Sequence, residues 1–375
     1  MVFTAASGQA DTYLADRYRS SHLDEQACMN ADGIQHPGGR VLGSANPRTP
    51  AFDLLRVFGA FAVVLIHVCG AYRDGLAEIG AAAWATTIGL NGLSRWAVPL
   101  FIMISGALLL ADKRKFDLRH FVNRRLLKVV VPFVLWSVIY LCIDAYLRPD
   151  PGLWSKVAAL PTHAAWYHLS FFYFFIPLYL LIPVLMWIRD LPHGRHVLAS
   201  YLASWMVGIC IELFCPAKYR WPDFFLYSGY LLLGYFMRNI SNRVASILLV
   251  GGMFAAMLTS AAVIAQSLAA SDYVTGQWFS YKTVNVALAA VGVFCLGFLL
   301  TARRHTLPPL VSRLAASSLG IYLIHPIILI PLRDLGFRTG LPWLEIPIWF
   351  LGAFFAAFWL SNWLRSRPAT AWAVP

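Results

Sequence analysis

The feature that most constrains this chain is the repetition of apolar segments long enough to cross a membrane. From Pro50 onwards, apolar runs alternate with short polar segments almost to the end of the 375 residues. A membrane-spanning helix needs about 20 apolar residues, whereas a barrel strand would show alternating apolar and polar residues. Hydrocarbon admits only helices and closed barrels, because every backbone polar group must be satisfied there. We therefore predict an all-α, polytopic transmembrane helix bundle.

The apolar runs predict about ten spans. We place them at 52–72, 92–111, 127–147, 167–188, 197–215, 223–237, 244–266, 282–301, 314–332 and 343–364. Basic residues are concentrated in alternate connecting segments, most densely between Lys113 and Lys128. Because cytoplasmic loops carry an excess of Lys and Arg, we expect both termini to lie in the cytoplasm.

Composition excludes an ordinary soluble domain. The chain is 59% hydrophobic and 13% charged, whereas soluble domains carry roughly 25% charged residues. Its net charge of +12 does not indicate nucleic acid, because the basic residues lie between apolar runs rather than on a soluble face. The six cysteines show no metal-binding spacing, so we expect no metal site.

Three regions follow from this pattern. Residues 1–48 are polar and lack the apolar core of a signal peptide, so we expect a flexible cytoplasmic tail. A misplaced start codon explains this segment equally well. Residues 49–366 form the predicted membrane domain, and residues 367–375 form a short C-terminal tail.

The first span carries three ionisable residues, Asp53, Arg56 and His67. Charged groups inside spans are costly, which makes each of them a functional candidate. A spacing of eleven residues returns Arg56 and His67 to within roughly 20° of the same helix face, about 16 Å apart along the axis. Asp53 precedes Arg56 by three residues and can pair with it. Alternatively, the pair anchors the span at the interface and His67 bonds a neighbouring helix.

An extended ligand would suit this arrangement. Arg56 and the basic segment 113–128 can hold an anionic head group, while the reactive end lies near His67. A neutral imidazole can accept the proton of an attacking hydroxyl near neutral pH. The basic segment also has a purely topological explanation.

The first span resembles the acyltransferase 3 family of membrane O-acyltransferases. That family opens its first helix with Asp-x-x-Arg and places a His after ten intervening residues, which here are Asp53, Arg56 and His67. Further similar segments follow in the family's order. They are PLFIMISGALLL at 99–110, FVNRRLLKVVVPF at 121–133, AWYHLSFFYFFIPLYLLIPVL at 165–185 and SLGIYLIHPIIL at 318–329.

The resemblance implies an enzyme of the bacterial inner membrane. It would transfer an acetyl group from acetyl-CoA to a sugar hydroxyl of a cell-envelope or exported polysaccharide, such as an exopolysaccharide, or of its lipid-linked precursor. It also implies a catalytic role for Arg56 and His67, supported by Asp53, and donor-phosphate binding by Arg124, Arg125 and Lys128. Members often have Arg-x-x-Arg where this chain has Arg125-x-x-Lys128, and Lys lacks the planar fork suited to phosphate.

Four further residues are candidates for an acceptor path: Trp166, Tyr167, His168 and His325. The first three also fit an aromatic belt at a membrane interface. For His325, we favour a bond from its ring to a backbone carbonyl freed by Pro326. The alternative function is a transporter or flippase for a sugar or lipid-linked intermediate, in which buried Arg and His form a proton relay.

Overall fold

Every regular element that the structure describes is a helix. The computed structural model describes residues 49–148, 152–215, 222–338 and 340–375, and these contain helices without any strand. The predicted all-α membrane bundle is therefore confirmed. The predicted N-terminal tail, 1–48, lies outside the described residues.

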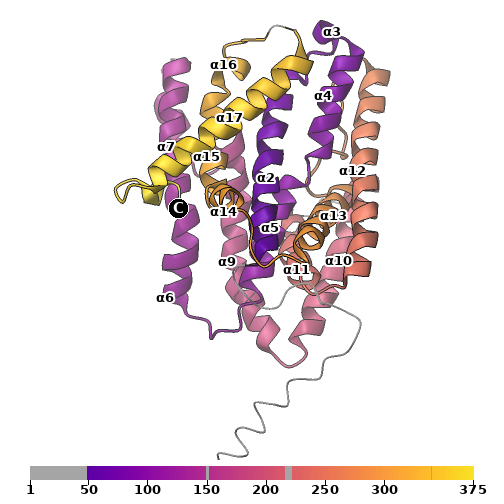
Figure 1. The fold of residues 1–375 in the computed structure, drawn as a ribbon, viewed down its shortest axis with the longest axis vertical. Coiled ribbons are helices and arrows are strands. Elements are labelled where there is room, and N and C mark those ends of the chain that lie inside the picture. Colours follow the sequence, from indigo (N-terminus) through magenta and orange to yellow (C-terminus); the bar gives the residue numbers. More distant parts are fainter. Residues whose placement is uncertain (1–48, 149–151, 216–221, 339) are drawn as a thin grey trace, which may run out of the picture. The chain divides into compact units, whose positions relative to one another are not determined.

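The helices are arranged as shown in Figure 1. The longer ones are α2 (Pro50–Cys69), α4 (Ala81–Leu93), α5 (Ala97–Leu109), α7 (Leu127–Leu147), α9 (Ser170–Asp190), α10 (Gly194–Phe214), α11 (Asp223–Met237), α12 (Asn242–Ala270), α13 (Val284–Thr301), α15 (Ser318–Ile328) and α17 (Pro342–Arg365). The shorter ones are η1 (Gly70–Tyr72), α3 (Leu76–Ile79), α6 (Leu118–Phe121), the π-helical η2 (Val122–Leu126), α8 (Leu153–Ala159), η3 (Tyr167–Leu169), α14 (Pro309–Ala316), α16 (Ile330–Arg333) and η4 (Ala371–Ala373).

The structure contains eight helices long and apolar enough to span a membrane, among the residues it describes. A ninth candidate is the pair α14 and α15, which meet at 70°. The predicted span 223–237 coincides with α11, whose 15 residues fall short of the usual length of about 20. The predicted span 92–111 is only the second half of a 29-residue helical segment, 81–109. Sequence reading missed α4 because Asn91, Ser94 and Arg95 interrupt its apolar pattern.

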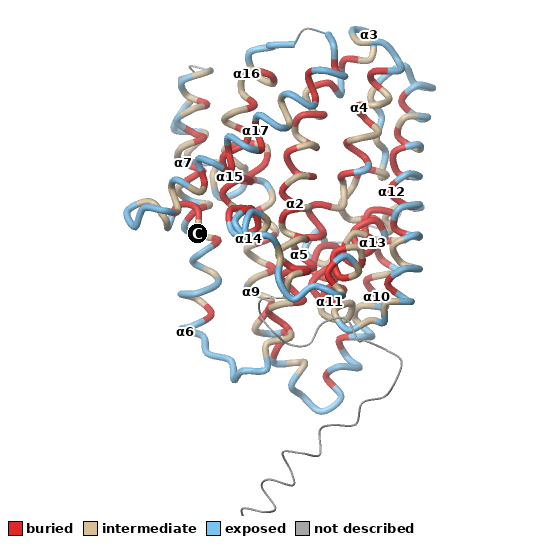
Figure 2. The backbone as a smooth tube through the Cα atoms, viewed as in Figure 1, coloured by how far each residue is buried: buried red, intermediate tan, exposed pale blue. Residues whose placement is uncertain are grey.

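Helix α2, which carries the ionisable residues of the first span, lies inside the bundle. It contacts α4, α5, α13, α14, α15 and α17, and Figure 2 shows buried residues along most of its length. Leu55, Val64 and Val68 are fully buried. An ionisable side chain on α2 therefore faces other helices or an internal cavity rather than lipid.

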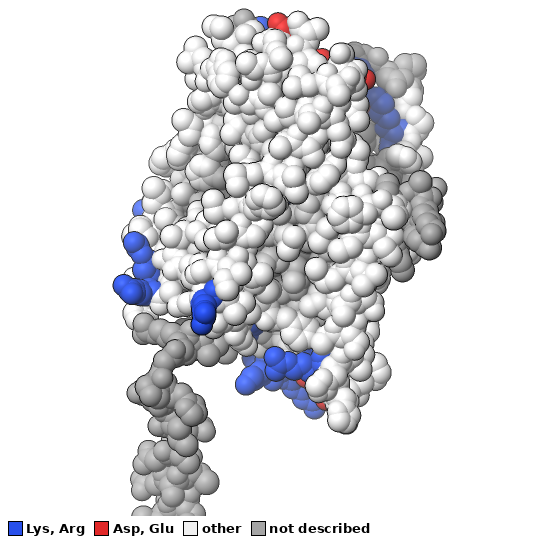
Figure 3. All heavy atoms as spheres, turned by 90° about the vertical axis from the view of Figure 1, so that its right-hand side faces the viewer, with Lys and Arg blue, Asp and Glu red and all other residues white. Residues whose placement is uncertain are grey.

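The outer helices expose apolar side chains instead. Ile247, Val250 and Phe254 of α12 are each more than 60% exposed. In Figure 3, which shows this side of the bundle, charged side chains gather towards the upper and lower parts and leave a broad uncharged area between them. A bilayer explains such a surface, because exposed apolar patches of this extent are rare on soluble monomers.

The two ends of the bundle differ. One end carries α6 and the basic segment 113–128, and we call it the basic end; it is the lower end in Figure 1. The opposite end carries α3 and α16. Because α2 leads from Pro50 to α3, His67 lies towards the opposite end and Arg56 towards the basic end.

Two glycines allow α5 and α11 to touch backbone to backbone. A Cβ on Gly106 would lie 1.9 Å from the carbonyl oxygen of Leu231, and a Cβ on Gly234 would lie 1.9 Å from that of Met103. Real Cβ atoms essentially never approach so closely. Small residues commonly provide such close packing between membrane helices.

We predict that Gly106→Ala destabilises the protein by about 1–3 kcal/mol, because the methyl group forces α5 and α11 apart. Thermal unfolding in detergent should show a lowered melting temperature. The matched control is Gly251→Ala in α12, where a Cβ would meet no atom within 4 Å. Equal melting temperatures for the two variants would contradict the importance of this contact.

Candidate active site

The position of His67 is determined by side chains that bind the backbone around it. Helix α2 ends at Cys69, where the backbone N–H of Gly70 caps the carbonyl groups of Ile66 and Val68, and side chains supply further donors to this helix end. Arg333 Nη1 donates to the carbonyl oxygen of His67 at 2.7 Å, and Asn91 Nδ2 donates to that of Ile66 at 3.0 Å. Residues of α16 and α4 therefore hold the end of α2 in place.

The His67 ring lies against two residues that the sequence proposed for the acceptor path. Its centroid is 4.8 Å from that of Tyr167 and 5.2 Å from that of His325, with which it is stacked at 26°. His168 follows at 5.9 Å from His325. Residues from three distant parts of the chain thus form one aromatic cluster around His67.

His325 satisfies a backbone carbonyl with one nitrogen and leaves the other unused. Its Nδ1 lies 3.0 Å from the carbonyl oxygen of Ile321, one residue before the carbonyl that Pro326 leaves free. The Nε2 atom is buried and has no hydrogen-bond partner among the described residues. If Nδ1 donates to the carbonyl, Nε2 of a neutral ring is an acceptor. The ring therefore bonds the carbonyl group of Ile321 instead of the one that we expected Pro326 to free, and its Nε2 atom is left unused.

The other two candidates differ in their surroundings. His168 is 3% exposed, and neither of its ring nitrogens has a hydrogen-bond partner among the described residues. Trp166 is also buried, packs against Tyr140 at 5.4 Å and lies under the guanidinium of Arg148 at 5.5 Å. Both lie inside the bundle rather than on a lipid-facing surface.

A cavity of about 280 Å³ opens beside His67, and we call it the His67 cavity. Tyr167, His168 and Arg333 line it, but Trp166 does not. A second cavity of about 210 Å³, the Arg56 cavity, is lined by Arg56, together with Ser105 and Tyr179. The two cavities share two lining residues, Phe171 and Tyr322.

A third cavity of about 230 Å³ lies at the basic end, and we call it the basic cavity. Arg114, Lys115 and His120 line it. It shares Leu109 and Arg125 with the Arg56 cavity. The three cavities therefore adjoin one another in series from the basic end to His67.

Arg56 is oriented by Asp53, as their spacing predicts. Arg56 Nη1 and Asp53 Oδ1 are 2.8 Å apart, and each side chain is 33% exposed. The two residues lie about one helical turn apart on α2. Arg56 also lines the Arg56 cavity, so the ion pair leaves part of its guanidinium facing that cavity. Arg56 and His67 thus address adjacent cavities from one helix.

The three basic residues predicted to bind the donor do not share one location. Arg125 lines both the basic cavity and the Arg56 cavity. Lys128 instead lines a separate cavity with Arg365 and Trp372, and Arg124 lines none of these cavities. The π-helical turn η2 contains Arg124 and Arg125; such a turn inserts a residue and changes the direction in which neighbouring side chains point.

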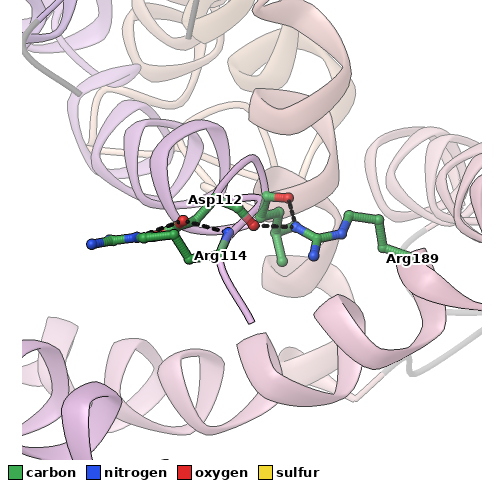
Figure 4. Close-up of polar contacts among 4 residues, drawn as sticks. Asp112, Arg114 and Arg189 are labelled. Atoms are coloured by element: carbon green, nitrogen blue, oxygen red, sulfur yellow. Dashed lines mark hydrogen bonds and ion pairs between the residues drawn. The ribbon is translucent and has the colours of Figure 1, made fainter. Parts of the chain in front are cut away.

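Arg189 binds the backbone beside Asp112, which lines the basic cavity, a role that sequence reading missed. Its Nη1 donates to the carbonyl oxygens of Leu110 and Asp112 at 2.6 and 2.8 Å (Figure 4). Arg114 Nε donates to the Asp112 carboxylate at 3.0 Å. These hydrogen bonds from Arg114 lower the pKa of Asp112 to about 2, so the carboxylate stays ionised at neutral pH. The sequence feature that could have indicated this role is the position of Arg189 in the last turn of its helix, α9.

The residues around His67 offer proton transfer and anion binding. No group of three or more His, Cys, Asp or Glu residues in the described segments could hold a metal ion. The imidazole of His67 can act as a base, and the nearby guanidinium groups can bind anionic oxygens.

Comparison with known proteins identifies the family of this chain. Residues 49–364 match the family model described as an acyltransferase domain. Comparison with curated proteins and with solved structures gives no match. Because the family match extends over most of the chain and includes all the helices around His67, the chain belongs to the acyltransferase 3 family and is a membrane acyltransferase.

Proposed function

We propose that this acyltransferase transfers an acetyl group from acetyl-CoA to a sugar hydroxyl of an exported or cell-envelope polysaccharide or of its lipid-linked precursor. An exopolysaccharide is our first candidate. The observation that carries the proposal is the series of three adjoining cavities, which links a cationic entrance to a histidine. A long donor with an anionic head and a reactive end needs such a path.

The donor would enter at the basic end. Coenzyme A carries several negative charges, and Arg114, Lys115 and Arg125 line the basic cavity. Two acids also line it, but Asp112 is paired with Arg114 and the Asp117 side chain accepts from the backbone N–H of His120. The cavity therefore retains a positive balance, which favours phosphate groups.

The pantetheine arm would occupy the Arg56 cavity. Most of that lining is apolar, contributed by residues such as Phe101, Leu108 and Phe175, while Arg56 supplies one charge. A chain of a dozen or more bonds can cover the roughly 16 Å along α2 between Arg56 and His67. The thioester would then reach Phe171 and Tyr322, where the Arg56 and His67 cavities adjoin.

His67 would act as the general base. It takes the proton from the acceptor hydroxyl while the hydroxyl oxygen attacks the thioester carbonyl. A carbon–oxygen bond forms, the carbon–sulfur bond breaks, and the leaving thiolate receives the proton from His67. The products are an acetyl ester and coenzyme A, and no redox partner is required.

This scheme includes a topology. We place the basic end in the cytoplasm of a bacterial cell, where coenzyme A is present, and the opposite end on the outer side of the inner membrane. The acceptor would approach from that opposite end, where the His67 cavity lies. A transporter or flippase remains the competing function, and it would move a glycan without consuming a thioester.

The experiment that separates these functions follows labelled acetyl groups. Purified protein in liposomes is supplied with [¹⁴C]acetyl-CoA and with glycan extracted from a deletion strain. We expect label to enter the glycan only when protein is present and when acetyl-CoA reaches the basic end. Movement of glycan across the liposome membrane without incorporation of label would refute acetyl transfer and favour the transporter.

We predict that His67→Ala and His67→Gln each reduce acetyl transfer by a factor on the order of 10² or more, because neither side chain can accept the proton. Expression and membrane insertion should be retained, since removing a polar ring from an apolar span favours insertion. Label incorporation in liposomes measures the effect, and His196→Gln on an exposed surface of α10 is the control. Normal transfer by His67→Gln would exclude a general-base role.

We predict that Arg125→Gln raises the KM for acetyl-CoA on the order of tenfold, because it loses a charged hydrogen bond to the head group. The kcat should change little, since a remote head group contributes mainly uniform binding. Initial rates over a range of acetyl-CoA concentrations provide both constants.

The matched control for this prediction is Lys128→Gln, which removes an equal charge three residues away in a different cavity. Its KM should stay close to that of the wild type. If both variants raise the KM equally, the effect comes from the general charge of the segment and Arg125 has no specific role.

A further inference from the structure

The His67 cavity is cationic. Three arginines line it, Arg73, Arg95 and Arg333, and its described lining residues include no Asp or Glu. The cavity lies inside a helix bundle, where charges are poorly screened and unpaired cations are costly. Such a lining requires either internal counter-ions or an anionic ligand.

Only one of these arginines has an acidic partner among the described residues. Arg73 Nε lies 3.1 Å from the Asp74 carboxylate, which balances its charge. Arg95 and Arg333 form no ion pair with any carboxylate of the described segments. The cavity therefore keeps two uncompensated guanidinium groups.

Aromatic rings hold Arg95 in place instead of an acid. Its guanidinium carbon lies 4.5 Å from the ring centroid of Phe279 and 5.5 Å from that of Tyr281. Nη1 donates to the Tyr281 hydroxyl at 3.3 Å, and the buried Nε has no hydrogen-bond partner among the described residues. Stacking on rings orients a guanidinium without neutralising it. Arg95 is therefore oriented while its charge stays available to a ligand.

Arg333 connects the cationic lining directly to His67. One of its nitrogens donates to the backbone oxygen of His67, and its guanidinium carbon lies 4.3 Å from the ring centroid of Tyr167. No other hydrogen bond from this guanidinium to a described residue is present. An anion bound to Arg333 would consequently lie beside the residue that activates the acceptor hydroxyl.

We propose that the acceptor is an anionic glycan, whose carboxylate or phosphate binds Arg95 and Arg333 in the His67 cavity. This proposal rests on the acetyl transfer proposed above. Guanidinium groups suit both anions, because their planar forks match paired oxygen atoms. In the proposed function the donor's phosphates bind at the basic end, in a separate cavity, and so would not account for Arg95 and Arg333. Binding of the anion would position a hydroxyl of the same or a neighbouring sugar at His67.

Direct binding to the full-length protein tests this proposal. The protein is placed in nanodiscs, loaded with coenzyme A, and titrated calorimetrically with methyl β-D-glucuronide, glucose 6-phosphate and methyl β-D-glucoside. We expect at least one of the two anionic sugars to bind about tenfold or more tightly than the neutral glucoside. Preference for the glucuronide identifies a carboxylate, and preference for the sugar phosphate identifies a phosphate.

Variants of Arg95 test whether this preference depends on the arginines of the His67 cavity. Arg95→Gln should remove it, whereas Arg95→Lys, which keeps the charge but loses the fork, should retain part of it. The control is Arg148→Gln, because Arg148 also lies at the opposite end of the bundle but is already paired with Asp144 and Asp334. Folding of each variant is checked by its melting temperature and by its affinity for coenzyme A.

Two results of the binding experiment would overturn the anionic acceptor. One is equal or undetectable binding of all three sugars by the wild type, and the other is an undiminished preference in Arg95→Gln. The proposed acetyl transfer is judged separately, from glycan acetylation by the wild type and its loss in His67→Ala. Acetylation of a neutral glycan would leave acetyl transfer intact and refute only the anionic acceptor.

Discussion

The structure around the candidate site depends on one requirement, which is that backbone carbonyl groups at the end of α2 must be satisfied inside the bundle. Water is scarce there, and an unsatisfied carbonyl is costly. Arg333 supplies a donor to the His67 carbonyl, and Asn91 adds a second donor to the Ile66 carbonyl, which also accepts from the Gly70 N–H. Because the two side chains come from α4 and α16, satisfying the end of α2 also assembles three helices around His67. The hydrogen bonds that stabilise the end of α2 thus also position the imidazole of His67.

The charged residues on and beside α2 likewise combine a structural role with a position at a cavity. Asp53 orients Arg56, and Arg333 combines a structural bond to His67 with a free edge in the cavity. Arg56 and Arg333 thus each have both a hydrogen-bond partner and access to a cavity, which lessens the cost of a charge in a low dielectric. The adjoining cavities follow this line of charges from the basic end to the opposite end. We therefore interpret them as the routes of donor and acceptor, which would meet at His67.

Much of the fold could be predicted because hydrophobic length is a local property. Each predicted span overlaps a helix of the structure. Helix α4 was missed because Asn91 near its end and Arg95 just after it interrupt the apolar run, and both residues now contribute to the site. The pairing of Asp53 with Arg56 was also predictable, since it lies within one helical turn. In contrast, Arg125 and Lys128 are three residues apart, a spacing that places two residues on the same face of an α-helix. They nevertheless line different cavities, which the spacing does not predict.

By itself, the sequence determined that the protein is a helical membrane bundle, that its first span carries Asp53, Arg56 and His67, and which family it resembles. These features depend on composition and on spacing within single helices. Only the tertiary structure brought His168, His325 and Arg333 to His67 and left Arg95 without an acidic partner among the described residues. Those relations join helices that are far apart in the chain. They depend on how the helices pack, because burial and hydrogen-bond satisfaction are decided between helices rather than within them.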